Sequence, residues 1–308
     1  MTVITEIKNI RFDQPTAVAL GFFDGVHKGH QAVISAAVNY VKPSSLTSHL
    51  IPVVFTFSQH PRAYFGDAPE LISDGNGCLD CFEKLGVEAV IVANFGDFAQ
   101  MTAVEFYAFL RDKLNMRAAF YGYNYRFGKG REGDGELLAR LCKKDGITDV
   151  PIAPVLFDGE PVSSSRIRAA LNTGDIDSAS KMLGRDILLT ARVENGKNLG
   201  HKLGFATINQ PLTAVVRPLL RGVYAAEVTL SGKVYPAVTN LGARPTVLQS
   251  EEAAETHIIG FEGDLYGQSV GVRFLKFLRP QRKFDSVEQL KDQIRRDVEA
   301  ALKLGGSK

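Results

Sequence analysis

The chain has 308 residues, 45% of them hydrophobic and 23% charged, a composition typical of globular proteins and a length sufficient for two domains with separate cores. Lys and Arg total 36 and Asp and Glu total 34, so the net charge of +2 provides no general attraction to nucleic acid or anionic lipid. The N-terminus lacks a signal-like pattern, and no apolar run approaches the ~18 residues of a membrane span. We therefore expect a cytoplasmic protein that binds neither nucleic acid nor membranes.

The first half of the chain alternates strand and helix patterns. Apolar runs typical of buried strands cover residues 17–20, 51–57, 89–93, 117–121 and 147–155, and helical spacing occurs at 30–38, 79–85, 102–110 and 137–141. Thr102 and Glu105 have the spacing of a capping box. Because repeated strand–helix units build a parallel sheet that is covered on both faces, we predict a Rossmann-like α/β domain over residues 1–185.

The three cysteines, Cys78, Cys81 and Cys142, do not make a disulfide framework. Cys78 and Cys81 form a C-x-x-C pair, a spacing found in redox and zinc sites. However, they fall at a predicted helix, and no second pair of ligands appears at zinc-like spacing. We expect both residues to be structural.

Residues 21–30, Gly-Phe-Phe-Asp-Gly-Val-His-Lys-Gly-His, join the first predicted strand to the first helix. In an open parallel sheet ligands bind at such a junction, and the N–H groups of a helix N-terminus attract phosphate. Gly29 would let the backbone approach a phosphate, while His27 and His30 share one face of the turn. Two loop histidines alone are more often simply solvated, but the whole segment indicates a site for the α-phosphate of a nucleotide.

Three more segments carry polar groups at strand ends or at a helix start, where such groups are able to bind a ligand. Residues 56–61, Thr-Phe-Ser-Gln-His-Pro, and residues 122–128, Gly-Tyr-Asn-Tyr-Arg-Phe-Gly, follow strand ends beside the histidine-containing loop, which favours a site over a mere turn. Residues 162–168, Val-Ser-Ser-Ser-Arg-Ile-Arg, precede a helix. Their serines are good N-caps, and together with Arg168 they also form an anion site.

The pattern changes after Gly184, where we place the domain boundary. Alternating runs at residues 187–193, 222–228 and 270–274 predict antiparallel strands, and several such strands in residues 186–308 predict a small β-barrel. A terminal helix follows, capped by Asp285 and Ser286. Its apolar stripe, which we expect to pack on the barrel, consists of Val287, Leu290, Ile294, Val298 and Leu302.

The informative segment of this second domain is residues 196–209. Glycines at 196, 200 and 204 let the backbone bend around an anion. Thr207 and Asn209 alternate along a strand, so their side-chain oxygens share one face. Oxygen ligands suit Mg²⁺, which takes its remaining ligands from water and nucleotide phosphates.

The first-half segments together resemble nucleotidyltransferases, in particular the bifunctional riboflavin kinase/FAD synthetases. Residues 21–30 resemble G-x-F-D-x-x-H-x-G-H, with Phe22 where Asn is frequent. The later segments resemble T-F-x-P-H-P with Gln59 for Pro, G-x-D/N-F-x-F-G, and I-S-S-T-x-I-R with Ser165 for Thr. The resemblance implies that a flavin contacts His60 and Pro61. It also implies nucleotide contacts by Gly21, Phe23, Asp24, Gly29, Asn124, Ser164, Ser165 and Arg168.

The second half resembles the riboflavin kinase part of the same family. Residues 196–209 resemble G-x-x-x-G-x-x-L-G-F-P-T-A-N, with Ala206 for Pro and Ile208 for Ala, and the resemblance continues through residues 222–225, 240–246, 255–258 and 264–267. It implies nucleotide contacts by Gly196, Gly200, Lys202 and Gly204, Mg²⁺ ligation by Thr207 and Asn209, and Glu255 as the base. Gln281 replaces the family's frequent Glu after Pro.

The resemblance implies two reactions: MgATP phosphorylates riboflavin to FMN, and a second ATP transfers AMP to FMN, giving FAD and pyrophosphate. His27 and His30 would be catalytic by stabilising charge at the α-phosphorus. We expect riboflavin, FMN and ATP as the binding partners, and a monomer or weak homo-oligomer. Two alternatives remain open: another adenylyl- or cytidylyltransferase whose barrel positions substrate, and a flavin-sensing regulator with degenerate sites.

Overall fold

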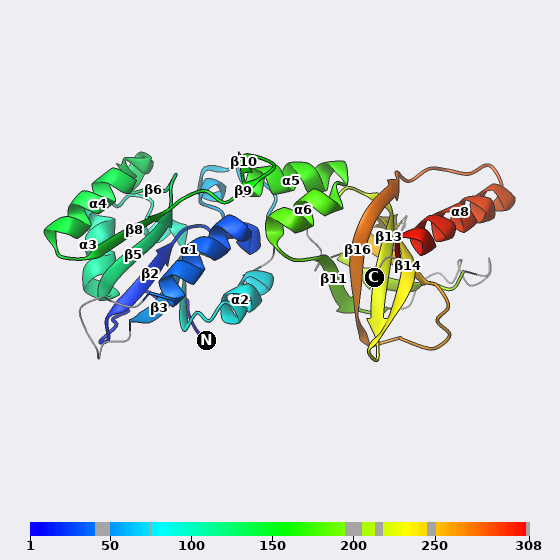
Figure 1. The fold of residues 1–308 in the computed structure, drawn as a ribbon, viewed down its shortest axis with the longest axis horizontal. Helices are drawn as coiled ribbons and strands as arrows, with labels where there is room; N and C mark the ends of the chain where they lie inside the picture. Colours follow the sequence, from blue (N-terminus) through cyan, green and yellow to red (C-terminus); the bar gives the residue numbers. More distant parts are fainter. Residues whose placement is uncertain (41–49, 74, 195–204, 213–217, 245–250, 306–308) are drawn as a thin grey trace. The chain divides into compact units, whose positions relative to one another are not determined.

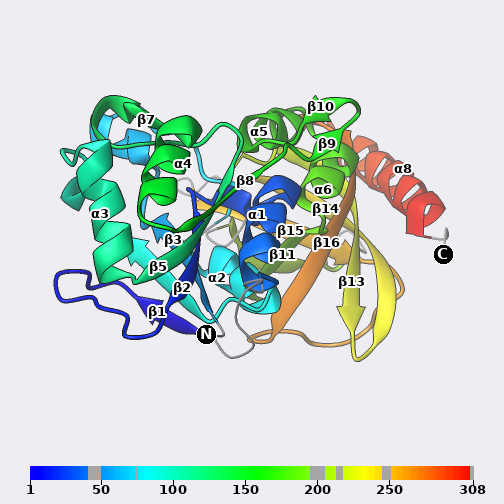
Figure 2. The same cartoon turned by 60° about the vertical axis from the view of Figure 1, so that its left-hand side comes forward.

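The computed structural model describes residues 1–40, 50–73, 75–194, 205–212, 218–244 and 251–305. The chain forms two compact units, Met1–Ser164 and Ser165–Lys308, each of which is described by itself below. Figures 1 and 2 show the elements of both units in two views.

The first unit is built on a six-stranded sheet in the order β1-β4-β3-β2-β5-β8. All its neighbouring strands are parallel, which confirms the predicted parallel sheet. The strands are β1 (Thr2–Ile4), β2 (Thr16–Leu20), β3 (Ile51–Phe57), β4 (Ala89–Ala93), β5 (Met116–Gly122) and β8 (Thr148–Ile152). Two short hairpins add β6 (Arg126–Phe127) with β7 (Gly133–Asp134), and β9 (Leu156–Phe157) with β10 (Glu160–Pro161).

Helices cover both faces of this sheet (Figure 1). Helices α1 (Lys28–Val38) and α2 (Gly75–Lys84) contribute Ile34 and Phe82 to the core of one face. Helices α3 (Ala103–Lys113) and α4 (Gly135–Lys144) contribute Leu110 and Cys142 to the core of the other. The predicted capping box of Thr102 and Glu105 is confirmed. Short 3-10 helices are η1 (Asp24–Val26), η2 (Pro61–Phe65), η3 (Phe95–Asp97) and η4 (Lys129–Arg131).

The strand order places three loops at one edge of the sheet. From the central β2, the chain builds β3 and β4 on one side and β5 and β8 on the other. Leu20, near the end of β2, lies opposite Phe55 of β3 and Tyr121 of β5. The segments that follow these strands therefore leave the same carboxyl edge, where the strand order reverses and where ligands bind in open α/β sheets.

The second unit contains a nearly closed antiparallel barrel, as predicted. Its strand order is β11-β16-β13-β14-β15-β12, with β11 (Ile187–Arg192), β12 (Ile208–Pro211), β13 (Gly222–Leu230), β14 (Lys233–Arg244), β15 (Glu251–Ile258) and β16 (Ser269–Arg279). Gln210 of β12 is fully buried and donates to the carbonyls of Ala191 and Val270, each at 2.8 Å. These bonds link the end strand β12 to β11 and β16, and so bring the two ends of the sheet together.

Helix α6 (Ile176–Leu183) packs against β11 and β16 of this barrel unit, and α5 (Ser164–Thr173) precedes it. The Leu220 amide donates to the Leu171 carbonyl at 3.0 Å. Gly174, which joins the two helices with φ 76°, has no room for a side chain because a Cβ would lie 2.9 Å from Phe277. The functional boundary near residue 185 stays a prediction, although both helices contact the barrel unit.

The terminal helix α8 (Val287–Gly305) lies against β13 and β14 (Figure 2). Ala301 and the carboxylate of Asp297 are buried on its inner face, and Val298 packs beside them. The predicted apolar stripe is wrong at its ends, because Val287 and Leu302 are 51% and 47% exposed. Asp297 and Ala301 are residues of α8 that face the barrel. A prediction based on apolar residues alone does not select the charged Asp297.

Two candidate active sites

The loop of residues 21–30, called the histidine loop below, has an unusual backbone. Gly25 and Val26 have positive φ angles of 76° and 38°, and the latter is uncommon for a β-branched residue. The buried Asp24 carboxylate accepts from the amides of Ile72 at 2.8 Å and Ser73 at 3.3 Å. This carboxylate therefore holds the loop against residues 72–73, and the predicted nucleotide contact of Asp24 stays a prediction.

The two histidines of the loop form a stacked pair. Their ring centroids are 3.6 Å apart with an interplanar angle of 19°, and the His30 amide donates to Nδ1 of His27 at 3.3 Å. Burial, and secondly the neighbouring His27, lower the pKa of His30 well below 6.5. His30 is therefore neutral at pH 7. Its Nδ1 is buried and makes no hydrogen bond to any described residue, which leaves that atom for a ligand.

Two glycines of the loop make room for rings. A Cβ on Gly29 would lie 3.1 Å from Cε1 and 3.2 Å from Nδ1 of His27, and one on Gly21 would lie 3.0 Å from the ring of Phe23. Phe23 is itself buried, and its ring meets that of His30 edge-on at 5.2 Å. The Phe23 side chain thus supports His30 from the core, so a nucleotide contact by Phe23 must come from its backbone.

The other predicted segments of the first unit come to the same sheet edge. His60 caps η2 by accepting from the Arg62 amide at 3.1 Å, and its ring meets Phe22 edge-on at 4.9 Å. Asn124 lies exposed in the turn after β5. The Ser164 hydroxyl donates to the Asp24 carbonyl at 3.2 Å, which ties the serine segment to the histidine loop. Ser165 and Arg168 belong to the second unit, and their roles stay predictions.

In the barrel, three polar residues occupy one row across neighbouring strands. Glu255 of β15 is directly opposite Asn209 of β12 and directly opposite Asn240 of β14. Residues opposite each other in an antiparallel pair project from the same face with Cβ atoms about 4.5–5.5 Å apart. The register therefore brings the predicted base beside a predicted metal ligand. Gly196, Gly200, Lys202 and Gly204 lie outside the described residues.

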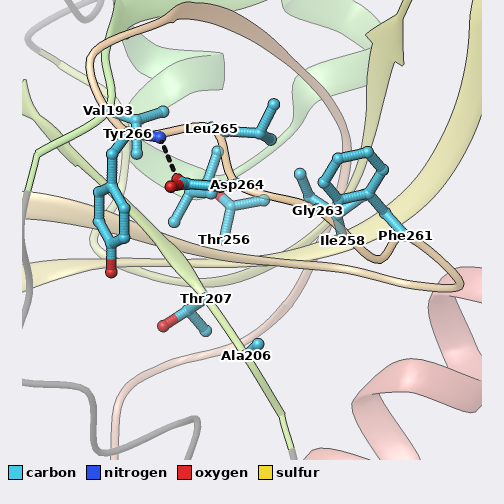
Figure 3. A pocket seen from close by; sticks show the side chains of 11 residues that line it. Val193, Ala206, Thr207, Thr256, Ile258, Phe261, Gly263, Asp264, Leu265 and Tyr266 are labelled. Carbon is cyan, nitrogen blue, oxygen red and sulfur yellow. Dashed lines mark hydrogen bonds between the residues drawn. The ribbon is translucent and has the colours of Figure 1, made fainter.

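A cavity of about 180 Å³ in this unit is lined by Thr207, Ile208 and Thr256 and by none of the three residues of the row, and Figure 3 shows the Thr207 hydroxyl and the Tyr266 ring at its wall. The Asp264 carboxylate accepts from the Tyr266 amide at 2.8 Å and so shapes the loop on that side. The His257 ring nitrogen bonds the Ala206 carbonyl at 2.8 Å. The residues that line the cavity are Val193, Ala206, Thr207, Ile208, Thr256, Ile258, Phe261, Gly263, Asp264, Leu265 and Tyr266.

Comparison with known proteins gives one consistent result. A family model described as FAD synthetase matches residues 9–166, and one described as riboflavin kinase matches residues 183–304. A bifunctional riboflavin kinase/FMN adenylyltransferase of Haemophilus influenzae is 34% identical over 94% of this chain and 94% of its own length. The Escherichia coli K12 protein of the same description is 33% identical over 94% and 92%. The chain belongs to this bifunctional family.

Family membership confirms both predicted activities, riboflavin kinase and FMN adenylyltransferase, and does not favour the two alternatives. A crystal structure from Streptococcus pneumoniae, described as a macrolide-efflux protein, matches with a TM-score of 0.84 at 30% identity and covers 98% of this chain and 99% of that one. Among the described residues of the present family member, no helix is both long and apolar enough to cross a membrane.

Sequence reasoning missed an aromatic cluster next to the predicted flavin residues of this family member. Tyr64 and Phe65 of η2 and Phe95 of η3 have ring centroids 5.2 to 6.2 Å apart. Phe65 is 70% exposed. Exposed apolar groups that gather in one place mark binding surfaces. These positions have no periodicity in the sequence that would identify them.

The barrel residues of this family member fit the expected Mg²⁺. The donors are the hydroxyl of Thr207 and the buried amide of Asn209, and neutral oxygen donors suit a Mg²⁺ ion that shares its coordination with water and phosphate. The described residues contain no cluster of three His, Cys, Asp or Glu side chains that would hold a metal without the nucleotide. The binding of Mg²⁺ itself stays a proposal.

Proposed function

We propose that the two reactions occur at the two sites described above, with riboflavin phosphorylated at the Asn209–Glu255 row and AMP transferred at the histidine loop. The observation that carries the barrel assignment is the register that sets Glu255 directly opposite Asn209. The observation that carries the other is the stacked pair of His27 and His30 at the sheet edge.

In the kinase step, the terminal ribityl hydroxyl attacks the γ-phosphorus of ATP. A new O–P bond forms, the bond from the γ-phosphorus to the bridging oxygen breaks, and ADP leaves. The hydroxyl must lose its proton, and the exposed carboxylate of Glu255 is the group that accepts it. Thr207 and Asn209 would hold Mg²⁺, which neutralises phosphate charge when bound.

In the adenylyl step, an FMN phosphate oxygen attacks the α-phosphorus of ATP, and the bond to the bridging oxygen breaks to release pyrophosphate. The attacking phosphate is already ionised at neutral pH, so no base is needed. His27 and His30 donate N–H groups to the α-phosphate oxygens, where charge grows. Because His30 is neutral in the free enzyme, it acts as a preorganised hydrogen-bond donor there.

Ser164, Ser165 and Arg168 would hold the departing pyrophosphate. For the flavin, His60 and Pro61 lie at the start of η2, next to the exposed rings of Tyr64 and Phe65. The two rings are nearly perpendicular, at 85°, so one ring at a time offers its apolar face for stacking on an isoalloxazine. We include them in the flavin site. A cytoplasmic location, no nucleic-acid partner, and a monomer or weak homo-oligomer complete the proposal.

The test is to incubate the purified protein with riboflavin, MgATP and an ATP-regenerating system, and to separate the flavins by chromatography. We expect FMN to appear first and FAD to follow. Omission of Mg²⁺ with added chelator should stop FMN formation. Turnover of riboflavin without added Mg²⁺ would contradict the metal assignment, and failure to form FMN would contradict the barrel assignment.

A further inference from the structure

Gln281, which follows β16, lies directly over the backbone of Gly242 in β14. A Cβ on Gly242 would lie 2.0 Å from Nε2 of Gln281 and 2.5 Å from its Cδ. From this position Gln281 donates through Nε2 to Oδ1 of Asn240 at 2.8 Å. The absence of a side chain at Gly242 is thus what lets Gln281 reach Asn240.

Asn240 is in turn a neighbour of the proposed base. It is directly opposite Glu255 in the β14–β15 register, so the two side chains project from the same face. The bond from Gln281 occupies the amide oxygen of Asn240. The amide NH₂ is then the end of Asn240 that is able to donate to a carboxylate, and a carboxylate only accepts.

We propose that Gln281 is a positioning residue for riboflavin phosphorylation. By fixing the orientation of the Asn240 amide, it makes the NH₂ group the end that donates to one oxygen of the Glu255 carboxylate when the substrates bind. The other carboxylate oxygen then faces the ribityl hydroxyl. This inference rests on the proposed role of Glu255 as the base. Gln281 acts through its bond to Asn240.

The backbone next to Gln281 is anchored to the terminal helix. Arg279 donates to the buried carboxylate of Asp297 in α8, with Nη2 at 2.7 Å and Nε at 3.1 Å from its oxygens. Arg279 also donates to the Pro280 carbonyl at 3.2 Å. Buried, bidentate bonds of this kind define geometry well. Helix α8 therefore contributes to the site by holding the segment that carries Gln281.

The structure offers a substitution in a neighbouring strand that displaces the end of the Gln281 side chain. In Gly242→Ala the three atoms nearest to the new methyl group all belong to the flexible end of the Gln281 side chain, and Gly242 does not have a left-handed φ. Gly271→Ala is the matched control, because a Cβ at that strand position meets its nearest neighbour, Oγ1 of Thr190, at an ordinary 3.6 Å. Both variants of the full chain are compared with Gln281→Ala.

We expect Gly242→Ala and Gln281→Ala each to lower kcat for riboflavin phosphorylation by roughly tenfold, the scale of a misplaced reacting group. The KM values for riboflavin and MgATP should stay unchanged, as should FAD formation from supplied FMN. Gly271→Ala should behave as wild type. A kcat near wild type in Gln281→Ala, or an equal loss in Gly271→Ala, would overturn the proposal.

The double variant Gly242→Ala/Gln281→Ala shows whether the methyl group acts through Gln281. We expect it to match Gln281→Ala, because the side chain that the methyl group displaces is already gone. Full additivity of the two losses would overturn the proposal. Glu255→Gln, measured alongside, separates the base role of Glu255 from the positioning role of Gln281. Full kinase turnover in Glu255→Gln would refute the base role. Inactive Glu255→Gln together with fully active Gln281→Ala would refute the positioning role alone.

Discussion

His30 lies flat against His27, with ring centroids 3.6 Å apart, and its own amide donates to Nδ1 of the ring on which it stacks. Because Nδ1 of His27 accepts in that bond, Nε2 is the ring nitrogen of His27 that is able to donate. With His27 and His30 held by the backbone and by each other, their donors are oriented before ATP binds. Preorganised donors of this kind stabilise charge that develops in a transition state.

We therefore expect His27→Ala and His30→Ala to slow FAD formation from FMN and ATP by roughly 10²-fold or more, the scale for loss of one such donor. The affinity for ATP should change little, because the donors act mainly on the transition state. Initial rates of FAD and FMN formation are measured on the same preparation. Loss of FMN formation in parallel would indicate misfolding, and normal FAD formation would remove the residue from the site.

The buried His30 should also make stability depend on pH. Above about pH 6.5 both the folded and unfolded states hold a neutral imidazole, so this group adds no pH dependence. Below that value the unfolded chain gains a proton that the folded protein excludes, since burial and His27 lower the folded pKa. Unfolding is thus favoured as the pH falls.

His30→Asn should consequently show a smaller fall of Tm than wild type between about pH 7.5 and 5.5. Thermal unfolding is followed by circular dichroism in one buffer series of constant ionic strength. Parallel Tm curves for the two proteins would contradict the lowered pKa of His30.

A third prediction concerns which segment suffices for kinase activity. We expect residues 186–308 to form FMN but no FAD, because the kinase motifs all follow that boundary. A second fragment, residues 165–308, keeps α5 and α6, which contact the barrel through Leu171 and Gly174. This longer fragment should therefore be the more stable of the two by Tm. A folded 165–308 fragment that forms no FMN would show that the kinase needs the first unit.

The parts of both sites that are local in sequence were predictable, and those that depend on strand register were not. Glycine and histidine spacing located the histidine loop, because a strand-to-helix turn is defined within ten residues. The same pattern did not reveal that Gly29 makes room for His27. The contact of Gln281 with Asn240 joins residues 41 positions apart, and no periodic rule connects them.

The burial of individual polar and aromatic side chains was not predictable from the sequence pattern. Phe23 and Asp24 belong to a motif that is associated with nucleotide binding. In the structure, however, both side chains are buried beneath the histidine loop. In α8 the inner face includes the charged Asp297, whose burial depends on Arg279 of another element. A hydrophobicity pattern counts Asp297 as exposed, and so it shifted the expected stripe toward Val287 and Leu302.

Glu255 could serve as a base or as a structural carboxylate, and Glu255→Gln distinguishes the two roles. Glu255→Gln keeps the size of the side chain and its ability to accept a hydrogen bond, but an amide cannot take a proton from the ribityl hydroxyl. Riboflavin phosphorylation should therefore fall by roughly 10²-fold or more, while riboflavin and ADP still bind. FMN supplied directly should become FAD at the wild-type rate, because that step removes no proton.

Three measurements on this one variant decide between the roles: kinase kcat, adenylyl transfer from FMN, and Tm. Since Glu255 is an exposed strand residue, substitution of its carboxylate by an amide should leave Tm within a few degrees of wild type. A normal kinase kcat would refute the base role. A large drop in Tm with loss of both reactions would instead indicate that Glu255 has a structural role in the row formed by Asn209, Glu255 and Asn240.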